Sequence, residues 1–259
     1  MSFIQTALLG AIAGFTIYLG LPLGRIKGLT AGLRTFLSMT SAGILLFILY
    51  DVLSNLSEPI KATITAGRNY PQFFLLLAVF VLGFALGLLG LIAFDQRFMR
   101  SQPGAARPID PTRLAWMIAA GIGLHNFSEG LAIGQSAGRG DIGFAALLII
   151  GFGLHNATEG FGIVGPLVGT ERPSWRFIAL AGLVGGGPTF LGTMVGYYLL
   201  SDVTFVLFLS LAAGALVYII GELFNLNRRP ETKFPAGLGI LIGFLVGYFT
   251  DLILTIGGI

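Results

Sequence analysis

The sequence predicts an all-α membrane protein with eight transmembrane helices. Its residues are 55% hydrophobic and only 10% charged, with a mean hydropathy of +0.88, whereas about a quarter of the residues in soluble proteins are charged. The apolar residues fall into runs of about 20, the length that crosses the hydrocarbon core of a bilayer. These runs are apolar on every side and do not alternate with polar residues, which excludes the strands of a membrane barrel.

Eight such runs use nearly the whole chain. The first follows no basic segment and leads from Gly20 straight to Arg25 without a convincing cleavage site, so we interpret it as a retained helix and not as a signal peptide. Basic or glycine-rich stretches separate the later runs, and the longest connection, residues 100–108, reads as a flexible linker. We therefore predict a single transmembrane domain over residues 1–259, with helices near 3–23, 32–56, 72–94, 114–136, 142–168, 176–200, 203–224 and 235–257.

The basic residues predict the orientation of the helices. Twelve of the fifteen Lys and Arg residues lie in or beside the odd-numbered connections, and only Lys61, Arg68 and Arg139 lie in the even-numbered ones. Because cytoplasmic loops carry the excess of Lys and Arg, the odd connections are expected to face the cytoplasm and both termini to be extracytoplasmic. The net charge of +3 is thus a topology signal that gives no reason to expect a nucleic-acid partner, and we expect the inner cell membrane as the location.

The ionisable residues inside the predicted spans are acidic or histidine. They are Asp51, Glu129, Glu159, Glu222 and Asp251, together with the only two histidines of the chain, His125 and His155. A carboxylate at the centre of a bilayer costs about 2.5–3.5 kcal/mol on insertion scales, so several need a compensating partner. Because no Lys or Arg lies in the interior of a span, we predict that this partner is a cation.

Both histidines belong to a hexapeptide that occurs twice. The chain reads His125-Asn126-Phe127-Ser128-Glu129-Gly130 and, thirty residues later, His155-Asn156-Ala157-Thr158-Glu159-Gly160. Residues i and i+4 share one face of a helix, so each copy presents an imidazole and a carboxylate together, beside an asparagine. The two predicted helices are antiparallel neighbours, and the two halves can face each other across a midplane site.

The ligand types at this site narrow the choice of metal. The chain has no cysteine, so nitrogen and oxygen must hold the ion, and a mixture of imidazole and carboxylate suits Zn²⁺, Fe²⁺ or Mn²⁺. A midplane site between oppositely oriented repeats is the architecture of secondary transporters. The pattern therefore favours metal transport.

At these residues the chain resembles the ZIP family of divalent metal transporters, in particular its bacterial and archaeal GufA-like members. The resemblance implies eight helices in a 3+2+3 inverted-repeat arrangement and a homodimer in the lipid bilayer. It implies that the metal is the transported substrate, with Zn²⁺ first and Fe²⁺, Mn²⁺ or Cd²⁺ as further candidates, and that no prosthetic group is bound. It also implies a role for Glu222 in guiding the ion at the cytoplasmic mouth, and the implied metal ligands are His125, Asn126, Glu129, His155, Asn156 and Glu159.

The sequence departs from the family pattern at three places. Ser128 and Thr158 stand where the family usually has proline, and their hydroxyls can bond back to a carbonyl and bend the helix gently. Gly187, within Gly185–Pro188, stands where the family often has a glutamate, which puts a second metal ion in doubt. Asp51 stands where the family often has a histidine, near the external end of its helix.

The sequence-based hypothesis is that a divalent metal passes Asp51 from outside, binds the two His/Glu pairs, and leaves near Glu222. An intramembrane metal-dependent hydrolase would also bury a His/Glu centre, although it does not need an inverted repeat. A non-transporting metal sensor is a third reading, motivated by the missing carboxylate at Gly187.

Overall fold

The computed structural model describes residues 2–99, 110–138, 155–170, 172–198, 201–227 and 230–256. Within these ranges the chain is helical and contains no strand, which confirms the predicted all-α class. The helices are α1 (Phe3–Phe15, continued by 3₁₀ turns Thr16–Leu19 and Leu21–Arg25), α2 (Ala31–Thr65), α3 (Tyr70–Phe94, followed by a π turn, Asp95–Met99), α4 (Pro111–Gly138), a helical segment 155–164 with a 3₁₀ turn Gly165–Leu167, α6 (Trp175–Gly196), α7 (Asp202–Leu226) and, after a 3₁₀ turn Pro230–Thr232, α8 (Lys233–Ile256).

Six of the described segments are long and apolar enough to cross a membrane. They are Phe3–Arg25, Ala31–Thr65, Tyr70–Arg97, Trp175–Gly196, Asp202–Leu226 and Lys233–Leu252. Helix α4 is not one of them, because it carries the polar residues of the first motif. The first part of the fifth predicted helix, residues 142–154, lies outside the described residues, so its length is not tested.

Several helices begin at the polar residue that precedes the apolar run. The side chain of each such residue accepts a hydrogen bond from a backbone N–H in the first turn, which satisfies a donor that the helix itself leaves unpaired. These N-terminal caps are Ser2 on α1, Thr30 on α2, Asn69 on α3, Ser174 on α6 and Ser201 on α7.

Two helix ends differ from the predicted ones. The first helix loses its α-helical form after Phe15 and finishes in tighter 3₁₀ turns, the second of which contains Pro22 in its first turn. Helix α2 runs to Thr65, although the sequence predicted an end near residue 56, and it continues through Pro59. The polar residues after position 56 were read as the end of the span, but they lengthen the helix beyond the apolar run.

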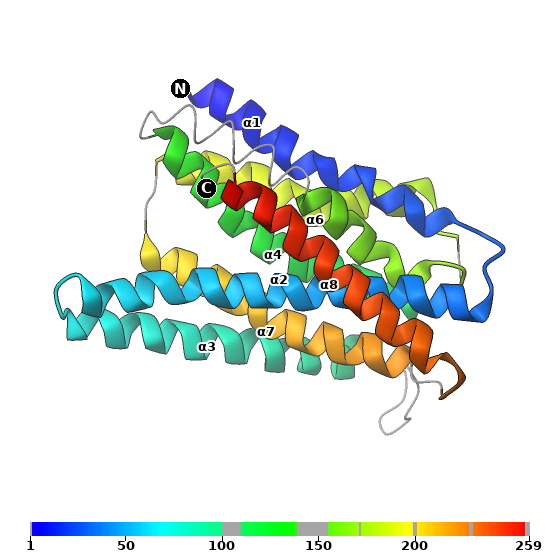
Figure 1. Ribbon diagram of the computed structural model, residues 1–259. Coiled ribbons are helices and arrows are strands. Elements are labelled where there is room, and N and C mark those ends of the chain that lie inside the picture. The colour runs from blue at the N-terminus through cyan, green and yellow to red at the C-terminus, as the bar shows by residue number, and fades with distance from the viewer. Residues whose placement is uncertain are drawn as a thin grey trace.

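The helices pack in two groups. Helix α6 contacts both α1 and α4, and α2 contacts both α7 and α8, while α3 lies along α7. In Figure 1 the helices α2, α3 and α7 run side by side in the lower half of the molecule, with α1, α6 and α4 above them. The helical segment 155–164 joins the upper group, because a Cβ atom at Gly160 would collide with the carbonyl oxygen of Ile17.

Glycines allow close backbone approach within each group. A Cβ atom at Gly123 or Gly130 of α4 would meet a carbonyl oxygen of α6, and one at Gly43 of α2 would meet a carbonyl oxygen of α8. In the same way, Gly87 of α3 lies against the backbone of α7. Such small-residue contacts hold membrane helices together where no hydrophobic force drives association.

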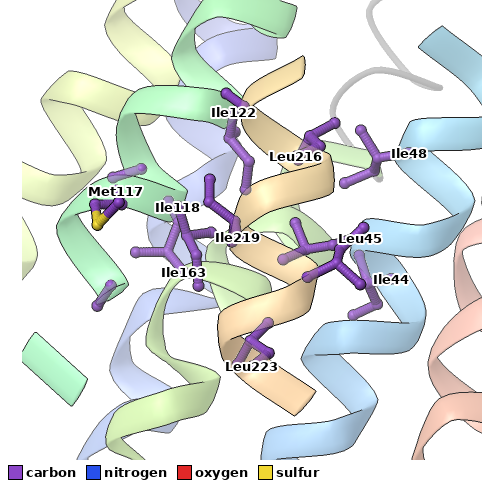
Figure 2. Close-up of a cluster of buried hydrophobic side chains, with 14 of the residues drawn as sticks. Ile44, Leu45, Ile48, Met117, Ile118, Ile122, Ile163, Leu216, Ile219 and Leu223 are labelled. Atoms are coloured by element: carbon purple, nitrogen blue, oxygen red, sulfur yellow. The ribbon is translucent and has the colours of Figure 1, made fainter. Parts of the chain in front are cut away.

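Branched side chains fill the contact between the two groups. Figure 2 shows this layer, in which side chains from α2 and α7 meet side chains from α4 and the segment 155–164. All of its members are buried: Ile44, Leu45, Ile48, Ile118, Ile122, Ile163, Leu216, Ile219 and Leu223. The two groups therefore touch through interdigitating side chains at this layer.

Candidate metal centre

The two copies of the hexapeptide meet at the centre of the protein. His125 and Glu129 lie one turn apart on α4, and His155 and Glu159 lie one turn apart on the segment 155–164. Their side chains form a closed ring of contacts, with His125 Nε2 at 3.4 Å from Glu129 Oε1 and 4.0 Å from Glu159 Oε1, and His155 Nε2 at 3.9 Å and 3.6 Å from the same two oxygens. The four residues are buried, and Glu159 has no exposed surface.

These spacings suit a tetrahedral metal ion. Four ligands about 2.1 Å from a Zn²⁺ ion, at the corners of a regular tetrahedron, are separated by about 3.4 Å. The four His–Glu separations, 3.4–4.0 Å, lie at or slightly above that value. One ligand atom each from His125, Glu129 and His155 lies within 4.8 Å of the others, so small side-chain movements are enough to close the ring around an ion.

The hydrogen bonding of the centre also favours an ion. Buried polar atoms are almost always hydrogen-bonded, because an unpaired one costs about 1–3 kcal/mol. Among the described residues, twelve buried side-chain nitrogen and oxygen atoms have no hydrogen-bond partner, and eight of the twelve belong to the two motifs. They are His125 Nδ1 and Nε2, Asn126 Oδ1, Ser128 Oγ, Glu129 Oε2, His155 Nε2, Asn156 Oδ1 and Glu159 Oε1.

The two asparagines occupy equivalent places but have unequal partners. Asn126 Nδ2 donates to Glu159 Oε2 at 2.8 Å and to the carbonyl oxygen of Gly185 on α6 at 3.1 Å. Asn156 Nδ2 donates to the carbonyl oxygen of Ala13 on α1 at 2.9 Å. Each amide is thus fixed by a neighbouring helix, and within the described ranges only Asn126 donates a hydrogen bond to a motif carboxylate.

Of the residues that depart from the family pattern, Thr158 has a clear local role and Ser128 does not. Thr158 Oγ1 donates to the carbonyl oxygen of His155 at 2.7 Å, as a hydroxyl in place of proline was expected to do, whereas Ser128 Oγ is buried without a hydrogen-bond partner. A Cβ atom at Gly187 would meet only the side chain of Leu183 within 4 Å. No ligand for a second ion comes from this position.

Two aspartates lie on the side of the centre that was predicted to face outward. Asp51 of α2 is half-buried, accepts a hydrogen bond from Asn55 at 2.9 Å, and is close enough to the histidines to interact with them electrostatically. Asp251 of α8 interacts with both Asp51 and His155. Asp251 was not predicted to take part in the site, because the interaction joins helices that are far apart in the chain.

Glu222 and Phe47 are two further buried residues that lie outside the two motifs. Glu222 is buried on α7 and lies outside the cluster of metal-binding groups. Phe47 is fully buried on α2, and its ring meets the ring of His155 edge-on with centroids 6.3 Å apart. The sequence analysis missed Phe47, although its position one turn before Asp51 was a usable signal.

Six helices long and apolar enough to cross a membrane, together with a buried His/Glu cluster that could hold a metal ion, define the class as an integral membrane protein with a candidate metal site. A family model described as ZIP zinc transporter matches residues 100–250. The zinc transporter ZupT of Shigella dysenteriae serotype 1 (strain Sd197) is 30% identical over 273 residues, which cover 97% of this chain and 98% of that one. ZupT from Escherichia coli O7:K1 (strain IAI39 / ExPEC) and from strain K12 / DH10B are each 30% identical over 278 residues, covering 99% of this chain and 98% of theirs. The chain belongs to the ZIP zinc transporter family, and the resemblance seen in the sequence is confirmed.

Proposed function

We propose that this chain carries Zn²⁺ across the inner cell membrane toward the cytoplasm, through a site formed by the six motif residues His125, Asn126, Glu129, His155, Asn156 and Glu159. Membership of the ZIP family makes the protein a divalent metal transporter and not an intramembrane hydrolase, and makes the metal its substrate and not a cofactor. Zinc is the first choice because the relatives are zinc transporters. Fe²⁺, Mn²⁺ and Cd²⁺ are further candidates, because the same nitrogen and oxygen donors bind them.

The observation that carries the proposal is the ring of two imidazoles and two carboxylates from antiparallel neighbours. Its spacings fit one ion, and most of the buried unpaired polar atoms of the described residues gather around it. A single ion is proposed, because Gly187 offers no ligand. These features favour a site that an ion enters and leaves over one that hydrogen bonds satisfy permanently.

The route and the architecture follow from the same proposal. The 3+2+3 inverted repeat, a single domain over residues 1–259 and extracytoplasmic termini are proposed from the charge distribution and from the family. Asp51, with Asp251 beside it, guides the ion on the outer side, and Glu222 guides it at the cytoplasmic mouth. The two helix groups move relative to each other to expose the site alternately, and the working unit is a homodimer.

The test is metal flux into proteoliposomes. The purified chain is compared with a Glu129→Gln/Glu159→Gln variant, which keeps the side-chain shapes and removes the two charges. A Glu58→Gln/Glu231→Gln variant is the matched control, because both of those glutamates are exposed and lie outside the site. Saturable Zn²⁺ uptake by the native chain and the control, with loss of uptake in the site variant, is the expected result.

Competition among Zn²⁺, Fe²⁺ and Mn²⁺ in the same vesicles ranks the substrates. Undiminished flux in the site variant, with all three proteins monodisperse and equally incorporated, contradicts the proposed site. Saturable binding without flux in the native chain contradicts transport and supports the sensor reading that the missing carboxylate at Gly187 suggested.

A further inference from the structure

We propose that the connections before α2 and α6 form a binding site for the phosphate of an anionic phospholipid. A pocket of about 170 Å³ lies between them, lined by Ile26, Lys27 and Gly28 on one side and by Gly169, Thr170 and Arg172 on the other. A second pocket of about 90 Å³ shares Thr170 and adds Arg34 of α2. The assignment goes beyond metal transport and requires only that these helix ends lie at a membrane surface.

The backbone of this pocket depends on two glycines. Gly28 has φ +72° and Gly169 has φ +70°, a left-handed conformation that a residue with a Cβ adopts at a cost. A Cβ atom at Gly169 would also press on Arg34 at 3.3 Å. Glycine at these two positions therefore lets both connections turn sharply and bring their basic side chains to one place.

The charges around the pocket are not balanced. Lys27 and Arg172 line it, Arg34 lines the second pocket, and Arg25 directly precedes Ile26 in the chain. Within the described parts of the chain none of these four residues forms an ion pair. Arg25 and Arg172 are close enough to repel each other. Glu171, which lies outside the described residues, is the only acidic residue in the sequence of the two connections. Four cations against one carboxylate leave a site that attracts an anion.

Two guanidinium groups present buried donors without acceptors. Arg25 Nε and Arg34 Nε are each buried with no hydrogen-bond partner, and a buried donor without an acceptor destabilises the fold. Phosphate oxygens match the planar donors of arginine and accept charge-assisted hydrogen bonds from them. The shared chemistry of the site is therefore a phosphate group.

The surroundings favour a lipid over a soluble phosphate. The guanidinium of Arg25 lies 4.4 Å from the ring centroid of Trp175, and its Nη1 donates to the carbonyl oxygen of Pro173. Trp175 is 63% exposed, and Leu23 and Ile26, close to Arg25 in the chain, are exposed as well. An exposed tryptophan with apolar neighbours at a helix end is typical of the headgroup level of a bilayer, where basic pockets between helices bind anionic headgroups. The connection from α1 to α2 lies at the right-hand end of the helices in Figure 1.

The test is retention of lipid by the full-length protein in a neutral detergent. Native mass spectrometry counts phosphatidylglycerol bound to the native chain and to a Lys27→Gln/Arg172→Gln variant, with phosphatidylcholine as the neutral lipid. The matched control is Arg97→Gln/Lys233→Gln, which removes the same charge from two exposed residues at other helix ends. At about 1 kcal/mol for each basic residue near a lipid surface, the pocket variant should bind phosphatidylglycerol at least about tenfold more weakly, while the control binds it as the native chain does.

Two further measurements distinguish a specific lipid site from general surface attraction and from a site for inorganic phosphate. Equal weakening in the pocket variant and the control, with equal thermal midpoints in phosphatidylcholine, overturns the proposal in favour of a general surface attraction. Inorganic phosphate is added in a separate arm, and a thermal midpoint that rises with phosphate but not with phosphatidylglycerol overturns the lipid assignment. Because neither pair of residues belongs to the metal centre, Zn²⁺ binding by all three proteins is expected to be equal, so a failure here is separate from a failure of the proposed transport site.

Discussion

Replacing each asparagine of the repeated motif by alanine should have unequal effects on metal binding. Asn126→Ala removes the hydrogen bond to Glu159 Oε2 as well as the one to the carbonyl of Gly185, whereas Asn156→Ala removes only the bond to the carbonyl of Ala13. If both amide oxygens are metal ligands, their loss costs the two variants about the same. The difference in Zn²⁺ affinity between the two variants is then set by the hydrogen bond from Asn126 to the Glu159 carboxylate.

The size of the difference follows from the type of bond. A neutral interhelical hydrogen bond contributes about 0.6 kcal/mol on average in a membrane protein, and each variant loses one. A hydrogen bond to a charged group contributes about 1.5–3 kcal/mol, and only Asn126→Ala loses one. Since about 1.4 kcal/mol is a factor of ten, Zn²⁺ should bind Asn126→Ala about ten- to a hundredfold more weakly than Asn156→Ala.

The assay is Zn²⁺ titration of the purified proteins in detergent, by competition with a fluorescent chelator. Adding Glu159→Gln to each variant completes a double-mutant cycle, in which Asn126→Ala should be strongly non-additive with Glu159→Gln and Asn156→Ala should be nearly additive. Equal losses of affinity in the two single variants, or a larger loss in Asn156→Ala, would refute the reasoning.

Three further predictions concern packing and protonation. Gly123→Leu should lower the thermal midpoint strongly, because even a Cβ atom there collides with the carbonyl oxygen of Val184, whereas Gly221→Leu, with open space around it, should leave the midpoint nearly unchanged. Phe47→Ala should cost about 3–5 kcal/mol of unfolding free energy, as for a fully buried aromatic. Chemical denaturation checks this, with Phe74→Ala at an exposed position as the control. A loss of stability equal to that of the control would contradict the prediction. Zn²⁺ affinity should fall as the pH is lowered from 7 to 5, because imidazole and carboxylate bind a metal only when deprotonated, and a pH-independent dissociation constant would contradict ligation by these groups.

The part of the site that the sequence could predict is the part that is local. A spacing of four residues on a helix places His125 beside Glu129 and His155 beside Glu159 whatever the rest of the chain does, and the structure has both pairs. The repeat also predicted that the two pairs face each other, and the structure brings them together, but the interactions of the site with the other helices were beyond reach. The electrostatic interaction of Asp251 with Asp51 and His155 depends on how α8 crosses α2, and no periodicity carries that information.

Among the helix ends, too, those set by local sequence were predicted well and the others were not. Apolar run length placed the start of α6 and α7 within a residue of the observed start, because Ser174 and Ser201 cap them locally. The end of α2 was placed nine residues too early, near 56 instead of Thr65. Hydropathy measures the thickness of lipid that a segment can cross, and a helix that continues beyond that thickness has no reason to stop where its apolar residues stop.

The burial of α4 has a consequence for how the chain is made. Its residues are buried almost throughout, with Ala120 the one exposed residue among those whose burial is described, while the apolar windows of α3 and α8 are only 17% buried. The helix that holds half of the metal site is thus one that lipid alone accepts poorly. Its partners, the segment 155–164 and α6, are both synthesised after it, so α4 must wait at the insertion machinery or beside earlier helices until they are available to cover it.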